Sequence, residues 1–321
     1  MRVASIYEPV QEELAEVEAT LKSVAQNEDP RLEKLLAHVL STGGKRLRPT
    51  IALLAGHLGD YRPELLVPLA SSIELLHTAT LVHDDVIDDS DTRRGRSTTN
   101  ATHHNAVAVM LGDYMFAHAA DLICRTESIE VVKLFSRTLM AMASGELTQD
   151  MSAYEYGQDT MVYFHRIAGK TASLFATSAE GGAMIAAVPD DSREALRNYG
   201  ENVGMAFQVV DDILDFTGDE SALGKPAGGD LMQGTLTLPA LLLMERQPED
   251  NPISKLFANR ERTEHLAEAI ALIRDSDIPD ESYTVARDFR DRAVAALDPL
   301  ADSPARTALI EIADEVISRN A

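Results

Sequence analysis

Two groups of aspartates in this chain repeat the same spacing at the end of an apolar stretch. The first group is Asp84, Asp85 and Asp88, and the second is Asp211, Asp212 and Asp215. Positions four apart on an α-helix differ by about 40° around the axis, so the outer carboxylates of each group project from one face. Like charges placed in this way destabilise a helix unless a cation lies between them. The two groups therefore predict a shared metal site.

The predicted metal is Mg²⁺, because every predicted ligand is a carboxylate oxygen. Mg²⁺ prefers oxygen ligands, keeps several waters and is often completed by substrate phosphates. Zinc sites need cysteine or clustered histidine, and the chain has one cysteine, Cys124. Di-iron bundles need Glu-x-x-His pairs, which are missing at matching positions.

Basic residues gather in four short stretches of a chain whose formal net charge is −23. The stretches contain Lys45, Arg46 and Arg48; Arg93, Arg94 and Arg96; Lys170, followed by Thr171; and Lys225. The planar guanidinium of arginine matches phosphate oxygens bidentately. These cations exceed what one phosphate group needs, so two diphosphates would account for both the metals and the cations. A nucleotide-binding P-loop is excluded because no Gly-x-x-x-x-Gly precedes Lys170.

The elements that carry these residues are predicted to be helices. Tryptophan is absent, aromatic residues are few, and no long window alternates as a β-strand does. Apolar spacing predicts helices over 10–25, 31–41, 51–58, 62–88, 106–124, 131–151, 192–216, 240–244, 263–273, 283–297 and 305–317, and a loop over 91–97. The helix 62–88 is apolar on most sides, which is typical of a central position. We predict an all-α fold in which residues 1–321 form a single large bundle, with the aspartate groups facing each other across a central cavity.

Composition also narrows the location and the partners. The strong negative charge argues against nucleic acid, which needs a basic face. The first residues lack the apolar core of a signal peptide, and no run approaches the roughly 18 apolar residues of a membrane span. The sequence predicts a cytoplasmic protein without an integral membrane segment.

Taken in order, the motifs closely resemble the trans-isoprenyl diphosphate synthases, the head-to-tail polyprenyl synthetase family. The markers are Gly43-Gly44-Lys45-Arg46-Leu47-Arg48-Pro49, the first aspartates, Arg93-Arg94-Gly95, Gly169-Lys170-Thr171, Phe207-Gln208, the second aspartates and Thr237-Leu238-Pro239. The resemblance covers most of the chain. It implies the isoprenoid synthase fold, a homodimer and a reaction between isopentenyl diphosphate and an allylic diphosphate.

The resemblance also implies a role for each marker. Roughly two or three Mg²⁺ ions would be held by Asp84, Asp88, Asp211 and Asp215, with Asp85 and Asp212 beside them in the metal site. Arg93, Lys170 and Lys225 would stabilise the departing diphosphate, assisted by Thr171 and Gln208. Isopentenyl diphosphate would be held by Lys45, Arg48, His77 and Arg94. In one departure from the family, Thr235 stands near Thr237-Leu238-Pro239, where relatives often carry lysine.

Product length is predicted from the residues below the first aspartates. At 1.5 Å per residue, Ala79 lies roughly 7–8 Å from Asp84 along the helix, a little more than one isoprene unit. Short-chain relatives commonly place a bulky aromatic there, whereas this chain has Ala79 and Thr80, with Leu76 a turn further down. The expected product is therefore about C30 to C50, unless Met110, Tyr114 or Phe116 closes the tunnel.

Alternatives stay open at this point. A short-chain synthase making C15 or C20 products would share every motif. A terpene cyclase also ionises an allylic diphosphate, but it has no second diphosphate to hold. A non-catalytic synthase subunit would be expected to lack aspartates or basic residues. A structural bundle with incidental acidic groups would not bind a diphosphate with Mg²⁺.

Overall fold

The computed structural model of the protein describes residues 6–41, 43–218, 227–259 and 263–319. In these ranges every long element is a helix, and the strands β1 (Thr92–Arg93) and β2 (Arg96–Ser97) have two residues each. The all-α prediction is therefore confirmed. The backbone contacts group into two compact units, which are taken one at a time below. That the chain forms a single domain stays a prediction.

Unit 1 consists of residues 1–137, 174–200 and 296–312. Its elements include η1 (Glu8–Val10), α2 (Gln11–Ala25), α3 (Pro30–Leu40), α4 (Leu47–Gly56), α5 (Pro63–Ile87), the β1–β2 hairpin, α6 (Thr99–Thr102), α7 (Asn105–Cys124) and most of α10 (Ser173–Ile185). Unit 2 consists of residues 138–173, 201–295 and 313–321. Its elements include α9 (Thr160–Ile167), η2 (Ala168–Ala172), α13 (Gly229–Met232), α14 (Leu238–Arg246), α15 (Pro252–Ala258), α16 (Thr263–Arg274) and α17 (Ile278–Ala296). Several residues of each unit come from α8 (Ile129–Met151), α11 (Asp190–Thr217) and α18 (Pro304–Ile317), which are divided between the two units.

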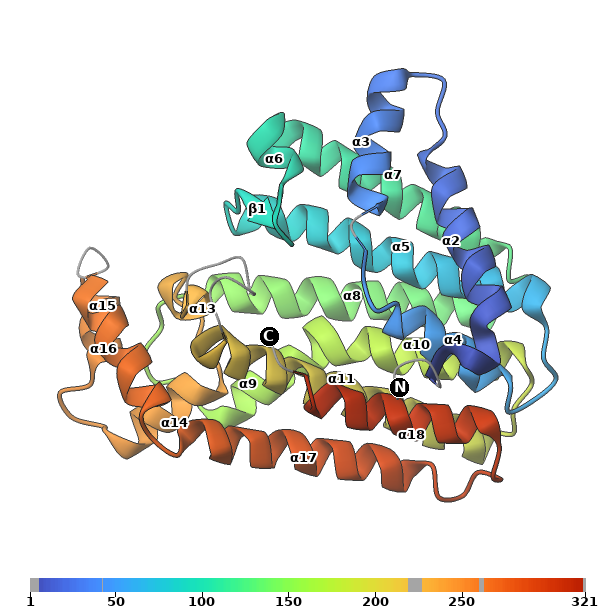
Figure 1. The fold of residues 1–321 in the computed structure, drawn as a ribbon. Helices are drawn as coiled ribbons and strands as arrows, with labels where there is room; N and C mark the ends of the chain where they lie inside the picture. Colours follow the sequence, from blue (N-terminus) through green and yellow to red (C-terminus); the bar gives the residue numbers. More distant parts are fainter. Residues whose placement is uncertain (1–5, 42, 219–226, 260–262, 320–321) are drawn as a thin grey trace. The chain divides into compact units, whose positions relative to one another are not determined.

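Helix α5 forms the centre of unit 1, as the predicted helix 62–88 required. It begins with Pro63, whose ring suits a first turn, and it ends one residue before Asp88. It lies beside α7 (Figure 1), and a Cβ added to Gly112 would come within 2.2 Å of the His83 ring. The Ser72 hydroxyl donates to the Ala119 carbonyl oxygen at 2.7 Å. Helices α5 and α7 are thus antiparallel neighbours, and Gly112 permits their close packing.

Some predicted boundaries were wrong. Helix α4 begins at Leu47, four residues before the predicted start at 51, and α17 begins at Ile278, five residues before the predicted start at 283. Both added segments contain a proline in the first helical turn, where no amide hydrogen bond is lost. The predicted loop over 91–97 contains the β1–β2 hairpin, and the segment 160–185 forms helices that the sequence did not predict.

In unit 2 the apolar face of α11 packs into a core shared with α9 and α14. Val209, Ile213 and Phe216 of α11 are fully buried, and Tyr163 of α9 is 1% exposed. Figure 1 shows α15 and α16 side by side in the same unit. Because the apolar side of α11 is fixed in this core, its aspartates are fixed as well.

Two helices are long and apolar enough to cross a membrane by length and composition alone. They are α5, where 72% of the apolar window is buried within the protein, and α7, where 39% is buried. Buried core helices of soluble proteins have the same composition, so the prediction of no membrane segment stays a prediction.

Candidate functional site

The first aspartate group lies at the carboxyl end of α5. Asp84 and Asp88 keep part of their surface in solvent, whereas Asp85 is 7% exposed. Arg93 donates from Nε to Oδ1 of Asp85 at 2.6 Å. Desolvation raises the pKa of Asp85, and the guanidinium of Arg93 opposes that rise. The group therefore has one aspartate tied to the protein and two nearer the surface.

The β1–β2 hairpin places Arg94 beside the glycine pair that precedes the basic stretch. Arg94 and Gly95 form its two-residue turn with φ of 51° and 72°, the backbone geometry that such turns need to match the strand twist. The Arg94 guanidinium donates to the Gly43 carbonyl oxygen. A Cβ at Gly44 would lie 3.1 Å from Arg94 Nη1. The Gly-Gly pair thus leaves room for an arginine from another part of unit 1.

Within the basic stretch 45–48, Arg46 is held by acids of the protein itself. It donates to Glu18 at 2.6 Å and to the buried Glu74 at 2.5 Å. Its neighbour Arg48 lies with its guanidinium carbon 4.2 Å from the centre of the Phe175 ring. The Tyr7 hydroxyl fixes the backbone by donating to the Lys45 carbonyl oxygen at 2.7 Å. Arg46 is therefore the anchor of the stretch, which agrees with the assignment of Lys45 and Arg48 as the predicted ligands.

His77 of α5 lies within reach of these cations. Desolvation lowers its pKa well below the usual range, and the positive charges of Arg48, Arg94, Arg93 and Arg46 lower it further. The imidazole is neutral at physiological pH for this reason. The structure thus brings Arg48, Arg94 and His77, three of the predicted ligands of isopentenyl diphosphate, together in unit 1, and Arg93 links them to Asp85 of the first aspartate group.

The second aspartate group lies on α11 in unit 2. Asp215 is 2% exposed, and it accepts at Oδ2 from the Asp230 amide at 3.3 Å. Asp211 is more accessible and forms an ion pair with Arg319. The Arg319 guanidinium also lies over the Phe207 ring, 4.0 Å from its centre. Nothing in the helical pattern of the sequence indicated Arg319.

Asp212 is the middle member of the second group and, like Asp215, is 2% exposed. Its carboxylate accepts from the Tyr163 hydroxyl at 2.7 Å and from Gln208 Nε2 at 2.8 Å. Gln208 in turn accepts from the Thr171 hydroxyl at 2.7 Å. Desolvation and the nearby charge of Asp230 raise the pKa of Asp212 to about 8, against the lowering effect of its hydrogen bonds. Sequence reasoning found Thr171 and Gln208 but not Tyr163.

Two further cations of unit 2, Lys170 and Arg166, lie close to residues that contact α11. Lys170 Nζ is 2.6 Å from Glu146 Oε2 on α8. Arg166 is 3% exposed and donates to the Leu236 carbonyl oxygen at 2.6 Å, next to Thr235. Burial lowers the pKa of Arg166, and the negative charge of Asp212 opposes this effect more than that of any other neighbour. A buried cation therefore lies close to the position where relatives often carry lysine. The predicted Lys225 lies outside the described residues.

The carboxylates fit a divalent metal that is shared with a substrate. Among the residues that the structure describes, no three acids, histidines or cysteines are arranged to hold an ion by themselves. In the first group Asp84 and Asp88 keep part of their surface in solvent, and in the second group Asp211 does, whereas Asp215 is 2% exposed. The middle aspartates, Asp85 and Asp212, are hydrogen-bonded inside the protein. One or two carboxylates completed by water and phosphate oxygens is the usual coordination of Mg²⁺.

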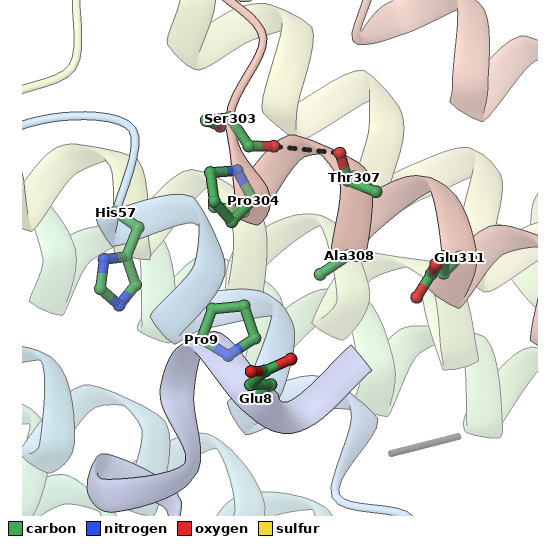
Figure 2. Close-up of a pocket in the computed structure, with 9 residues that line it drawn as sticks. Glu8, Pro9, His57, Ser303, Pro304, Thr307, Ala308 and Glu311 are labelled. Atoms are coloured by element: carbon green, nitrogen blue, oxygen red, sulfur yellow. Dashed lines mark hydrogen bonds between the residues drawn. The ribbon is translucent and has the colours of Figure 1, made fainter. Parts of the chain in front are cut away.

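An open pocket of about 720 Å³ lies elsewhere in unit 1, between η1, the end of α4 and the start of α18. Figure 2 shows Glu8, His57 and Glu311 around it, with the Thr307 hydroxyl donating to the Ser303 carbonyl oxygen. Among the described residues that line this pocket, none is a lysine or an arginine. Two glutamates without a cation disfavour a diphosphate, so the pocket is not the candidate site.

Comparison with known proteins gives one consistent result. The profile of the family described as polyprenyl synthetase matches residues 29–273, which is most of the chain. The chain is 38% identical over 313 residues to heptaprenyl diphosphate synthase component 2 of Geobacillus stearothermophilus, covering 98% of each protein. It is 36% identical over 316 residues to the all-trans-nonaprenyl-diphosphate synthase (geranyl-diphosphate specific) of Rhodobacter capsulatus, covering 98% of this chain and 97% of that protein.

A solved structure has the same fold. The polyprenyl synthase of Caulobacter crescentus CB15, crystallised with calcium and isoprenyl diphosphate, superposes with a TM-score of 0.94. It is 36% identical, and the match covers 99% of this chain and 98% of that one. The predicted fold class is therefore confirmed as that of the polyprenyl synthases.

Proposed function

This chain belongs to the polyprenyl synthetase family, and from that premise we propose that it joins isopentenyl diphosphate head-to-tail to an allylic diphosphate. The product would be an all-trans polyprenyl diphosphate of about C30 to C50, since its first aspartate group is preceded by small residues at one isoprene depth. The observation that carries the proposal is the concentration of cations around His77 beside the first aspartates. A metal-bound diphosphate and a second diphosphate are the ligands that such a mixture of charges suits.

In this mechanism the side chains bind, orient and neutralise. Asp84, Asp88, Asp211 and Asp215 would hold Mg²⁺, which supplies electrostatic stabilisation of the departing diphosphate when bound. The positive charge of Lys170 adds to that stabilisation. The other residues predicted to contact the leaving group are Arg93, Thr171, Gln208 and Lys225. Those predicted to contact isopentenyl diphosphate are Lys45, Arg48, His77 and Arg94.

The bond changes balance without a protein nucleophile. The allylic C–O bond breaks, and its electron pair leaves with the diphosphate. The double bond of isopentenyl diphosphate then supplies the electrons of the new C–C bond. The proton lost from the adjacent carbon passes to the released diphosphate. This agrees with the hydrogen-bonded position of Asp212, which is turned toward Tyr163 and Gln208 rather than held as a nucleophile.

Product length is proposed to depend on α5 below Asp84. Ala79 and Leu76 are fully buried, and Thr80 donates its hydroxyl to the His77 carbonyl oxygen at 2.8 Å. Among the alternative stoppers, Met110 is 71% exposed, and Tyr114 accepts from Asn27 at 3.1 Å. Phe116, the third alternative, lies edge-on to the His83 ring with 5.2 Å between the ring centres. We propose that the small side chain of Ala79 lets the growing chain extend past it, with Phe116 as the alternative stopper.

The direct test is chromatography of the products made from labelled isopentenyl diphosphate and allylic primers, with Mg²⁺ and with chelator. Chains of about C30 to C50 that require the metal are expected, since Ala79 gives no floor one unit down. Only C15 or C20 products would favour a short-chain synthase instead. The Ala79→Phe variant should shorten the products, and Ala79→Ser is the matched control that keeps the residue small.

The assembly and the location complete the proposal. Exposed apolar side chains occur on α7 and α8, among them Met110, Met140, Leu147 and Met151, and such surfaces support association with a second copy. The relative from Geobacillus stearothermophilus is named as a component, so a different partner chain is the alternative. Light scattering of the purified chain with activity measured on the same sample distinguishes an active homodimer from an inactive lone component. We propose a cytoplasmic location.

A further inference from the structure

Helix α8 presses against the segment that carries Lys170. That segment, η2, is a single stretch of π-helix between α9 and α10. A Cβ added to Gly145 would lie 2.8 Å from the Lys170 backbone nitrogen, and one added to Gly169 would lie 3.1 Å from the Ala141 carbonyl oxygen. Helix α8 and η2 can approach this closely only because each has a glycine at the crossing, Gly145 in α8 and Gly169 in η2. The backbone of Lys170 is therefore fixed against the residue that precedes Glu146.

The side chain of Lys170 closes a small network on α8. Its Nζ lies 2.6 Å from Glu146 Oε2 and 3.3 Å from Gln149 Oε1. Gln149 Nε2 donates to the other oxygen of Glu146 at 3.4 Å. The side chains of Lys170 and Glu146 are 29% and 18% exposed. The ion pair is thus shielded from bulk water on most sides, while the ammonium keeps a route to a bound anion.

The π-helical turn sends two consecutive residues to different helices. Lys170 reaches Glu146 on α8, whereas Thr171 donates to Gln208 on α11 at 2.7 Å. Insertions of this kind occur frequently at functional sites, because the extra residue redirects side chains that a regular helix would place elsewhere. Lys170 is accordingly held at both its backbone and its charged end.

We propose that Glu146 is a positioning residue for Lys170, with Gln149 as its support. The inference rests on the proposed contact of Lys170 with the leaving diphosphate. A lysine has a flexible four-carbon stem, and stabilisation of developing charge is strongest when the cation is already in place. Glu146 supplies that placement, so its contribution is to the rate of ionisation and not to the binding of isopentenyl diphosphate.

A double-mutant cycle in the full-length enzyme tests the inference. Lys170→Ala should lower kcat by about 100-fold, the cost of losing one preorganised charge. Glu146→Gln keeps the size of the side chain and should lower kcat by about tenfold, with KM for isopentenyl diphosphate unchanged. In the double variant, Glu146→Gln should have no further effect, because its only route to the reaction passes through Lys170.

Two further measurements make the outcomes distinct. Glu130→Gln removes the exposed partner of Lys133 on the same helix and should leave kcat unchanged. Thermal unfolding of each variant establishes that it is folded. If Glu146→Gln retains its full effect in the Lys170→Ala background, the positioning role is overturned and the proposed function stands. If Lys170→Ala alone leaves kcat unchanged, the proposed contact of Lys170 with the leaving group is wrong.

Discussion

The two aspartate groups have the same spacing in the sequence but opposite electrostatic surroundings. In unit 1 the middle aspartate, Asp85, is paired with Arg93, and burial together with nearby arginines lowers the pKa of His77. In unit 2 the middle aspartate, Asp212, accepts from the uncharged donors Tyr163 and Gln208, and burial together with the nearby acid Asp230 raises its pKa to about 8. The first group is surrounded by cations of the protein, whereas the second lies in an acidic setting.

The same aspartate motif therefore has two different surroundings, one rich in cations and one rich in acids. The cation-rich surroundings of the first group suit an anionic ligand that is bound together with a metal ion. The second group, in its acidic setting, has more to gain from a bound divalent cation. Arg166 and Arg319 offset part of its negative charge, since Arg166 is buried near Asp212 and Arg319 pairs with Asp211. The predictions below compare the two surroundings, beginning with the largest effect.

The largest expected effect is the loss of an outer aspartate, which should be equally severe in both groups. Asp84→Ala and Asp211→Ala should each lower condensation by about 10³-fold or more, since each removes a metal ligand at the site of charge separation. Incorporation of labelled isopentenyl diphosphate measures the rate. Asp113→Ala, which alters an exposed acid on α7, is the control. Full activity in either outer-aspartate variant would show that only one group holds metal.

The next effect concerns how the second group is held in place. Tyr163→Phe leaves a buried carboxylate oxygen without its donor and should lower the free energy of unfolding by about 2–3 kcal/mol. Tyr199→Phe is the matched control, because this buried tyrosine donates to a neutral carbonyl of Leu309 at 2.6 Å. Its loss should cost about 1 kcal/mol. Urea titrations at a pH above the Asp212 pKa of about 8, followed by circular dichroism, compare the two, and equal losses would mean that the charge of Asp212 adds nothing to its bond with Tyr163.

The spacing of the aspartates and the glycine-flanked cations could be predicted from the sequence, because helical periodicity and short basic motifs are local. The outer and middle aspartates could not be distinguished, since their burial depends on Arg93 in a hairpin and on Tyr163 in another helix. Arg46 and Arg48 look equivalent in the sequence. In the structure Arg46 is anchored by Glu74 on α5, whereas Arg48, a predicted ligand, lies over Phe175 on α10.

Glu146 and Arg319 were missed because their contacts join residues that are far apart in the sequence. Glu146 lies 24 positions before Lys170 in the chain, and its contact depends on two glycines that allow α8 and η2 to touch. Arg319 reaches Asp211 across more than a hundred positions. Neither contact leaves a periodic trace. The helix starts at 47 and 278 were missed because the apolar spacing begins later than the helix itself, whose first turn contains a tolerated proline in each case.

A smaller effect should appear in the pH dependence of stability. The pKa of His77 is lowered in the folded protein by burial and by the arginines around it. The unfolded chain therefore binds the proton first, so this residue's contribution is complete above about pH 7 and is lost as the pH falls through about 6.5. Replacement by glutamine, His77→Gln, should remove about 1 kcal/mol of the change in unfolding free energy between pH 7 and pH 5.5. Denaturant titrations at both pH values test this, and parallel losses in the two proteins would contradict a neutral His77.

The smallest expected effect contrasts the arginines that pair with the two groups. Arg93 binds the buried Asp85, whereas Arg319 binds the outer Asp211, which is also a predicted metal ligand. A divalent ion and the Arg319 guanidinium both favour the same carboxylate, so their binding should be competitive. Arg319→Ala should therefore tighten the binding of Mn²⁺ to the substrate-free protein by about two- to fivefold, the scale of a partly exposed ion pair.

The control for this comparison is Arg93→Ala, which removes the partner of an aspartate already turned into the protein. Its affinity for Mn²⁺, measured by electron paramagnetic resonance, should change less than that of Arg319→Ala. Weaker Mn²⁺ binding in Arg319→Ala would show that Arg319 orients Asp211 for the metal instead of competing with it. The two groups would then resemble each other, because each would depend on an arginine that holds one of its carboxylates in place.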